Sequence, residues 1–241
     1  MSYSSPWAFC LGLDLGQSRD VSALAILQEP LWADRGSLLA KHSGRTGWIF
    51  PSELENATTF YPDDGSPPSV PTPYPPLKLA WIGRFELKTK YTAVVDEVTR
   101  MIRRAPLSEL PTILVIDKTG VGAGPADAFE REGINQATIT IHSGTNVIEE
   151  APNSYRVPKR ELANTLETRL RTGRLWIPEG LEGRLALIQE MLTFRWRVNP
   201  KIANDSYSHR RPSDKDDLVL ATAMAAWFRD YYQGRFLLNS I

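Results

Sequence analysis

Cysteine is almost missing from this sequence, since Cys10 is the only one among 241 residues. A single cysteine excludes an intramolecular disulfide framework and fits a reducing compartment. Apolar runs of the about 18 residues that a membrane helix needs are missing too, and no basic segment followed by an apolar one marks a signal peptide. We therefore expect a cytoplasmic protein without a membrane partner, in which Cys10 is an ordinary buried side chain.

A surplus of charge of either sign is also lacking. The 28 Lys and Arg residues balance 28 Asp and Glu residues, which gives a net charge of zero. The overall charge therefore favours no partner, and any nucleic acid must be bound by local basic patches.

Hydrophobic residues make up 42% of the chain, which is enough to bury a full core. The length suits one domain over residues 1–241 that contains an insertion. We place this insertion at residues 29–76, which are rich in proline and show little periodicity. Such a segment is expected to leave the sheet as a long, partly extended excursion.

The stretch from Phe9 to Leu27, FCLGLDLGQSRDVSALAIL, contains two apolar runs around a polar turn. Alternation in the first run predicts a strand, and residues 22–27 predict its return partner. Asp14 lies inside the first run. A buried carboxylate is costly unless a cation or hydrogen-bond donors compensate it, which makes Asp14 a candidate ligand.

Helix and strand patterns alternate along the rest of the chain. Thr112 to Ile116 is a short apolar run that is typical of a central strand, and it ends in Asp117, before a glycine-rich loop. The other predicted elements are strands at 77–87 and 137–141, helices at 91–104, 126–132 and from 159 onward, a helix at 181–192 with Leu185, Ile188 and Leu192 inward, a small β-hairpin in the basic segment 193–215, and a buried helix from 216 onward. This order predicts an α/β fold with a mixed central sheet and helices on both faces.

Four acidic residues stand at the edges of strongly apolar elements: Asp14, Asp117, Asp216 and Asp217. In an open α/β sheet the ends of adjacent strands and the helices beside them meet in one crevice, so these carboxylates can lie together. Like charges at close range oppose folding unless divalent cations neutralise them. Carboxylate oxygens without His or Cys partners suit hard ions, Mg²⁺ or Mn²⁺. Helix N-capping is an equally good role for Asp216.

Three segments of the sequence resemble a known family. GLDLGQSRDVSALAIL, VIDKTGVGAGPADAF and DDLVLATAMAAW are similar to the three acidic motifs of the nuclease domain of phage large terminase subunits, which has a ribonuclease H-like fold. The segment VPKRELANTLETRLRTGRLWIP resembles the helix and strand ahead of the last motif in that family. The resemblance covers Phe9 to Trp227 apart from the proline-rich insertion.

The resemblance implies a metal-dependent DNA endonuclease. Its catalytic metal ligands would be Asp14, Asp117 and Asp217, with Asp216 as a fourth. Two Mg²⁺ or Mn²⁺ ions roughly 3.5 to 4 Å apart would bind the scissile phosphate, one activating a water and the other stabilising the leaving 3′ oxygen. The family cuts duplex DNA with little base preference during genome packaging in the bacterial host. The substrate must then be bound through its phosphates.

Basic residues are concentrated in residues 156–174 and 195–215. The second stretch adjoins the last acidic motif and contains Trp196 and Tyr207 between its charges. We predict that DNA is contacted by Arg195, Arg197, Lys201, Arg210, Arg211 and Lys215. A solvated surface hairpin explains the same charges equally well.

The chain departs from whole large terminases because it has no GxxxxGK[ST] loop for ATP phosphates. The chain would then be a separate nuclease subunit, a fragment or a prophage relic. Its partners would be a separate packaging ATPase, a small terminase subunit or a portal. Three other interpretations stay open. A sugar-kinase or actin-like ATPase opens with a similar hairpin, a Holliday-junction resolvase uses the same fold and metals on a branched substrate, and a non-catalytic DNA-binding assembly module retains only the fold.

Overall fold

An eight-stranded mixed sheet forms the centre of the structure, which is a computed structural model. The structure describes residues 7–16, 20–29, 48–49, 59–60, 76–194 and 215–238. The strand order is β10-β5-β2-β1-β6-β7-β9-β8. The strands are β1 (Phe9–Asp14), β2 (Ala23–Gln28), β5 (Leu77–Arg84), β6 (Thr112–Asp117), β7 (Gln136–His142), β8 (Ile148–Ala151), β9 (Ser154–Pro158) and β10 (Leu175–Trp176).

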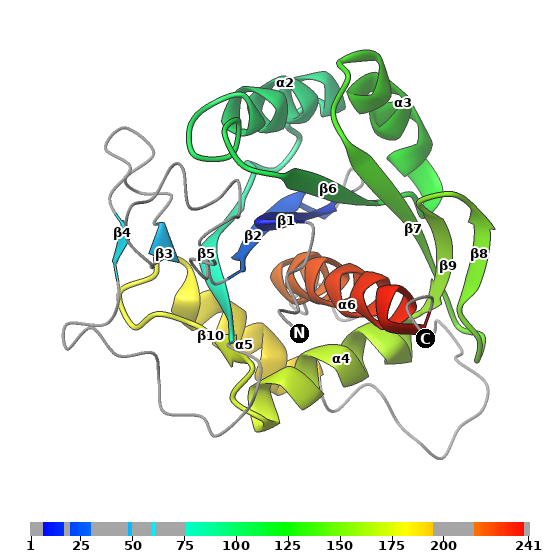
Figure 1. The fold of residues 1–241 in the computed structure, drawn as a ribbon. Helices are drawn as coiled ribbons and strands as arrows, with labels where there is room; N and C mark the ends of the chain where they lie inside the picture. Colours follow the sequence, from blue (N-terminus) through cyan, green and yellow to red (C-terminus); the bar gives the residue numbers. More distant parts are fainter. Residues whose placement is uncertain are drawn as a thin grey trace.

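Helices cover both faces of this sheet (Figure 1). The helices α2 (Tyr91–Ile102) and α3 (Ala123–Arg131) pack on one face, and a short 3-10 turn, η2 (Gly120–Gly122), leads into α3. The helices α4 (Lys159–Arg171), α5 (Arg184–Phe194) and α6 (Asp217–Leu238) lie on the other face. The predicted α/β class, with a mixed sheet between two helical layers, is confirmed.

Strand directions bring several strand ends to one edge of the sheet. β1 is antiparallel to β2 and parallel to β6, and β6, β7 and β9 are parallel to one another. β5 is antiparallel to β2 and therefore has the direction of β1. The C-terminal ends of β1, β5, β6, β7 and β9 thus share one edge, which we name the carboxyl edge.

β1 is buried on both faces, and its side chains alternate between the two cores. Phe9, Leu11 and Leu13 pack with α2 and α3, whereas Cys10 packs with α6. Gly12 points toward α6 as well, and a methyl group built on it would lie 1.9 Å from the carbonyl oxygen of Ala221. Only a glycine at this position allows α6 to approach β1 so closely. Burial raises the pKa of the Cys10 thiol, as expected for an inert side chain.

The predicted orientation of the helix at 181–192 is wrong. Leu185 is 72% exposed and Leu192 is 62% exposed, whereas Leu187, Glu190 and Phe194 form the buried face of α5. Apolar residues occur on more than one face of this helix, so their spacing does not decide which face turns inward. Polar contacts of Glu190 with β5 and α6 accompany the observed orientation.

The hairpin of β8 and β9 was not predicted from the sequence. All four residues of β8 are exposed, so the strand lacks the apolar alternation that marks a half-buried strand. Asn153 forms the turn with a positive φ of 58°. β9 then pairs in parallel with β7 and leads directly into α4.

Two predicted segments lie largely outside the described residues. Of the insertion at 29–76, the described parts are its two end residues and two short strands, β3 (Trp48–Ile49) and β4 (Thr59–Phe60), which pair with each other. The predicted hairpin of the basic segment 193–215 falls mainly on residues 195–214, which are not described, and Phe194, the first residue of the hairpin, belongs to α5. Within the described part of the chain, no helix combines the length and apolar character that crossing a membrane requires.

Candidate functional site

Asp14 and Asp117 lie at the ends of two neighbouring strands. Asp14 ends β1, Asp117 ends β6, and the parallel register pairs Leu13 with Ile116, one position earlier on each strand. Cys10 and Val115 belong to the core on the α6 face, and alternation therefore places both aspartates on that same face. Adjacent strands are about 4.8 Å apart, so the two carboxylates are close neighbours at the carboxyl edge.

The start of α6 brings two more acids to this place. Asp217 is the first residue of α6 and Asp216 precedes it. Ala221, one turn further along α6, is the residue that touches Gly12 of β1, two positions before Asp14. We name Asp14, Asp117, Asp216 and Asp217 the acid cluster; their exposed fractions are 8%, 9%, 2% and 4%.

Burial disfavours ionisation of two members of the acid cluster, Asp14 and Asp117. Burial raises the pKa of Asp14 well above its usual range, and the negative charges of Asp117, Asp217 and Asp216 raise it further. Burial also raises the pKa of Asp117, although hydrogen bonds from Thr119 and the charge of Lys159 act in the opposite direction. Positive charge beside these carboxylates favours their ionised form, and a bound cation would supply such charge.

Two basic side chains supply part of that charge. Lys159, the first residue of α4, donates a hydrogen bond from Nζ to Oδ2 of Asp216 at 2.8 Å, and its ammonium lies 5.3 Å from the centre of the Phe194 ring. Arg84 ends β5, and its register partner Ala23 is also the partner of Asp14. The Nε of Arg84 lies 3.8 Å from Oδ2 of Asp217.

The glycine-rich loop after β6 wraps around Asp117. The backbone N–H of Thr119 donates to Oδ1 of Asp117 at 2.7 Å, and the hydroxyl of Thr119 accepts from the N–H of Ile141 at 2.8 Å. Gly120 has a φ of 69°, and a methyl group on Gly122 would lie 2.0 Å from the carbonyl oxygen of Asp117. The glycines thus allow the tight turn that fixes the Asp117 carboxylate.

The donor chemistry of the acid cluster fits Mg²⁺ or Mn²⁺, since carboxylate oxygens are the ligands that these hard ions prefer. Within the described residues, no three His, Cys, Asp or Glu side chains already surround a common point as a metal site does.

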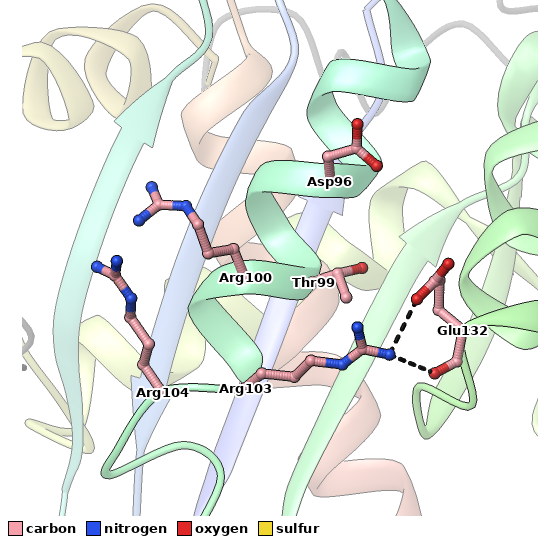
Figure 2. A pocket seen from close by; sticks show the side chains of 6 residues that line it. All are labelled: Asp96, Thr99, Arg100, Arg103, Arg104 and Glu132. Carbon is pink, nitrogen blue, oxygen red and sulfur yellow. Dashed lines mark hydrogen bonds and ion pairs between the residues drawn. The ribbon is translucent and has the colours of Figure 1, made fainter.

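A surface depression elsewhere on the molecule does not include the acid cluster (Figure 2). It has a volume of about 360 Å³ and is lined by Asp96, Thr99, Arg100, Arg103, Arg104 and Glu132. Arg103 donates to the carboxylate of Glu132 at 2.9 Å across this depression. The lining comes from α2, from the residues directly after it and from Glu132 after α3. The start of α2 is near the carboxyl edge, because Tyr91 donates to the carbonyl of Gly16 at 2.7 Å, so the end of α2 points toward the opposite sheet edge.

The structure describes one of the six residues that were predicted to bind DNA. Lys215 is exposed and directly precedes Asp216. The other five, Arg195, Arg197, Lys201, Arg210 and Arg211, lie outside the described residues. In the earlier basic stretch, Arg169 is buried and paired with Asp230, which removes it from the residues available to a substrate.

Sequence reasoning missed the polar residues that surround the acid cluster. Arg84 and Glu190 were not singled out, and Lys159 was counted only as part of a basic stretch. The signal for Glu190 was its position between Leu187 and Phe194, at helical spacing on one face of α5. A charged residue on a buried face requires partners, and those partners come from distant parts of the sequence.

Comparisons with known proteins find similarity in structure alone. No protein-family model matches the sequence, and no curated protein was found to match it. The fold is similar to that of the large terminase nuclease from thermophilic phage G20c over more than nine-tenths of the chain. The structure with bound magnesium has 16% identity, covers 93% of this chain and 82% of its own, and has a TM-score of 0.49. The structure with bound zinc has 15% identity, coverages of 91% and 80%, and a TM-score of 0.46.

Proposed function

We propose that this protein is a metal-dependent endonuclease that hydrolyses phosphodiester bonds of double-stranded DNA, with Mg²⁺ or Mn²⁺ bound at the acid cluster of a ribonuclease H-like fold. The main support is the position of Asp14 and Asp117 at neighbouring strand ends, on the sheet face that also holds the start of α6. Buried carboxylates gathered in this way are unfavourable without a cation, and metal binding explains why the sequence places them there.

The proposed metal ligands are Asp14, Asp117 and Asp217. Bound ions would supply Lewis-acid activation of a water and would neutralise charge on the phosphate. Asp216 takes a supporting position in this proposal, because its Oδ2 already accepts a hydrogen bond from Lys159. The Lys159 ammonium in turn limits the repulsion among the carboxylates. Burial of the four side chains strengthens their electrostatic attraction to a cation.

The proposed substrate approaches the carboxyl edge through its phosphates. Lys215 is exposed next to the acid cluster and is assigned to phosphate contact, together with the five basic residues between 195 and 211. By its resemblance to the terminase nuclease, the protein would cut concatemeric phage DNA in the bacterial host cytoplasm. Its partners would be a separate packaging ATPase, a small terminase subunit or a portal.

Cleavage of supercoiled plasmid tests the proposal. The purified protein should nick the plasmid with Mn²⁺ or Mg²⁺ and not with EDTA. Asp14→Asn and Asp117→Asn should each reduce the rate at least about a hundredfold, because the loss of one ligand removes several kcal/mol of transition-state stabilisation. Asp96→Asn, which changes an exposed aspartate on α2, is the matched control and should cleave as the wild type does.

Other results of the same experiments favour the other interpretations. Binding of ATP without any cleavage would support a kinase-like or actin-like domain. Cleavage confined to four-way junctions would support a resolvase. DNA binding without cleavage under any metal would support an assembly module. Equal nicking by the wild type and by both asparagine variants would contradict the proposed site.

A further inference from the structure

Glu190 is a buried acid on the inner face of α5, with 5% of its surface exposed. A carboxylate in such a place is costly unless hydrogen-bond donors surround it. Two donors come from α6: the backbone N–H groups of Leu218 and Val219 lie 3.0 Å and 3.2 Å from Oε2 of Glu190. A third donor comes from β5, because Nη2 of Arg84 donates to Oε1.

The two amides belong to the first turn of α6, where a helix has no acceptors of its own. A carboxylate at this end also interacts favourably with the positive end of the helix dipole. Asp217 opens this turn and Asp216 precedes it, while the next close anchor of α6 is the contact between Ala221 and Gly12. Glu190 is therefore an external cap on the start of α6, which begins at Asp217 directly after Asp216.

Arg84 extends this contact toward the carboxylates. Its guanidinium donates to Glu190 and also lies 3.8 Å from Asp217. Arg84 is in the same register row as Ala23 and Asp14. The Glu190 carboxylate thus connects the end of β5 with the start of α6.

We propose that Glu190 is a positioning residue of the candidate metal site: it fixes the first turn of α6 and Arg84 so that Asp217 faces Asp14 and Asp117. Glu190 does not bind the metal itself, because one of its oxygens is engaged by the α6 amides and the other by Arg84. This inference rests on the proposed function, since the purpose of the positioning is to bind a metal ion.

The variant Glu190→Gln tests the inference in the full chain. Glutamine is uncharged and has one acceptor oxygen in place of two, so the contacts of this side chain with the α6 amides and with Arg84 both weaken. We expect the Mn²⁺ dissociation constant, measured by titration calorimetry, to rise about tenfold, as it does when an outer partner of a ligand is removed. In the metal-free protein, hydrogen exchange at Leu218 and Val219 should become about tenfold faster.

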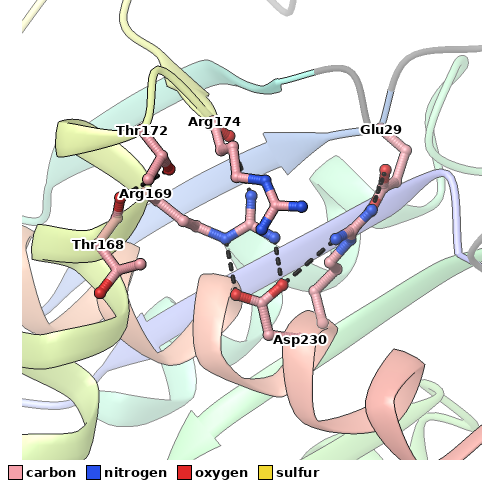
Figure 3. Close-up of polar contacts among 7 residues, drawn as sticks. Glu29, Thr168, Arg169, Thr172, Arg174 and Asp230 are labelled. Atoms are coloured by element: carbon pink, nitrogen blue, oxygen red, sulfur yellow. Dashed lines mark hydrogen bonds and ion pairs between the residues drawn. The ribbon is translucent and has the colours of Figure 1, made fainter. Parts of the chain in front are cut away.

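A matched control lies further along the same helix. Asp230 of α6 accepts a hydrogen bond from Nε of Arg169 at 2.9 Å, in a partly buried ionic network that also includes Arg229 and Glu29 (Figure 3). At 1.5 Å per residue this pair is about 20 Å from the first turn. Asp230→Asn should lower the unfolding temperature, while the Mn²⁺ dissociation constant and the exchange at Leu218 stay within about twofold of the wild type.

Four results decide the matter. A Mn²⁺ affinity in Glu190→Gln within about twofold of the wild type would overturn the inference, and so would an equal loss in Asp230→Asn. Loss of Mn²⁺ binding without faster exchange at Leu218 would also overturn it, in favour of direct ligation. If the wild type binds no Mn²⁺, the proposed function fails. Exchange at Leu218 then decides separately whether Glu190 holds the turn: faster exchange in Glu190→Gln supports the positioning, and unchanged exchange overturns it.

Discussion

Lys159 and Asp216 form an ion pair of 2.8 Å that joins the start of α4 to the start of α6. The pair is asymmetric, because the side chain of Asp216 is 3% exposed and that of Lys159 is 41% exposed. A cation that stays in contact with solvent thus compensates a carboxylate that does not. The same ammonium opposes the rise in the pKa of Asp14 and of Asp117.

Replacing Lys159 should destabilise the metal-free protein. Lys159→Gln leaves the buried Asp216 without this ion pair, and we expect a loss of about 1 kcal/mol, a small value because the lysine is partly exposed and screened. Urea unfolding at pH 7 in EDTA measures this loss. Lys118→Gln, at an exposed lysine after β6, is the control and should change stability by less than about 0.5 kcal/mol. Equal stability of Lys159→Gln and the wild type would contradict the expected role of the pair.

Removing the charge of Asp14 should stabilise the metal-free protein at neutral pH. The pKa of Asp14 is raised in the folded state, mainly by burial and then by Asp117, so the folded chain retains this proton more strongly than the unfolded chain. The stability contribution of Asp14 is therefore greatest at low pH and falls as the pH rises above about 3.9, the unfolded value.

The variant Asp14→Asn should consequently gain stability over the wild type at pH 8, and little or none at pH 4. A gain of about 1 kcal/mol raises the melting temperature by about 2 to 4 °C in a chain of this size. Thermal unfolding in EDTA at both pH values provides the test, with Asp96→Asn as the exposed control. A loss of stability at pH 8 would show that Asp14 is compensated within the metal-free fold.

Divalent cations should stabilise the wild type through the acid cluster. An ion at a hundred times its dissociation constant adds about 2.7 kcal/mol of stability, which corresponds to a rise of about 5 to 10 °C in the melting temperature. Asp14→Asn and Asp117→Asn should abolish the rise, and EDTA should reverse it. The same rise in either asparagine variant would place the bound ions elsewhere.

The approach of α6 to β1 should depend on the missing side chain at residue 12. Gly12→Ala brings a methyl group 1.9 Å from the carbonyl oxygen of Ala221, so α6 must move away, and we expect a loss of about 3 kcal/mol or more. Gly124→Ala is a contrasting control: nothing lies within 4 Å of its added methyl group, and in helix α3 the change should add about 0.5 to 1 kcal/mol. Chemical unfolding of both variants compares these opposite signs.

Lys215 should contribute to DNA binding without contributing to sequence preference. We expect Lys215→Gln to weaken binding to duplexes of different sequence to the same extent, and to reduce the slope of log K against log salt by about 1. Fluorescence anisotropy at several salt concentrations measures both effects. Arg104→Gln, at the opposite sheet edge, is the control. An unchanged slope for Lys215→Gln would exclude a phosphate contact by this residue.

Local patterns predicted the elements that contain Asp14 and Asp117, because both lie at the ends of apolar runs whose alternation or burial is visible in the sequence. The helix with Val94, Val95 and Val98 on one face was predicted for the same reason, and these residues are buried. The apolar run after Asp217 likewise predicted a buried helix, and α6 is buried around most of its circumference up to Arg229.

The surroundings of the acid cluster were not predictable from local patterns. Glu190 obtains its donors from β5 and from α6, which are distant in the sequence, and no short-range pattern reveals such pairing. The same contacts accompany the outward orientation of Leu185 and Leu192, against the expectation from apolar spacing. The exposed, acidic β8 was missed because its position depends on pairing with β9 and not on burial of its own side chains.

The distance along the chain between Asp14 and Asp217 has a consequence for biosynthesis. Roughly 200 residues separate the central strand from the helix that completes the acid cluster, and a ribosome needs about 10 to 40 s to add them. During this time β1 has no α6 to pack against at Gly12, and Asp14 has no partner acids from that helix. The four carboxylates therefore meet only late in translation, and a nascent chain that ends before α6 lacks the assembled cluster.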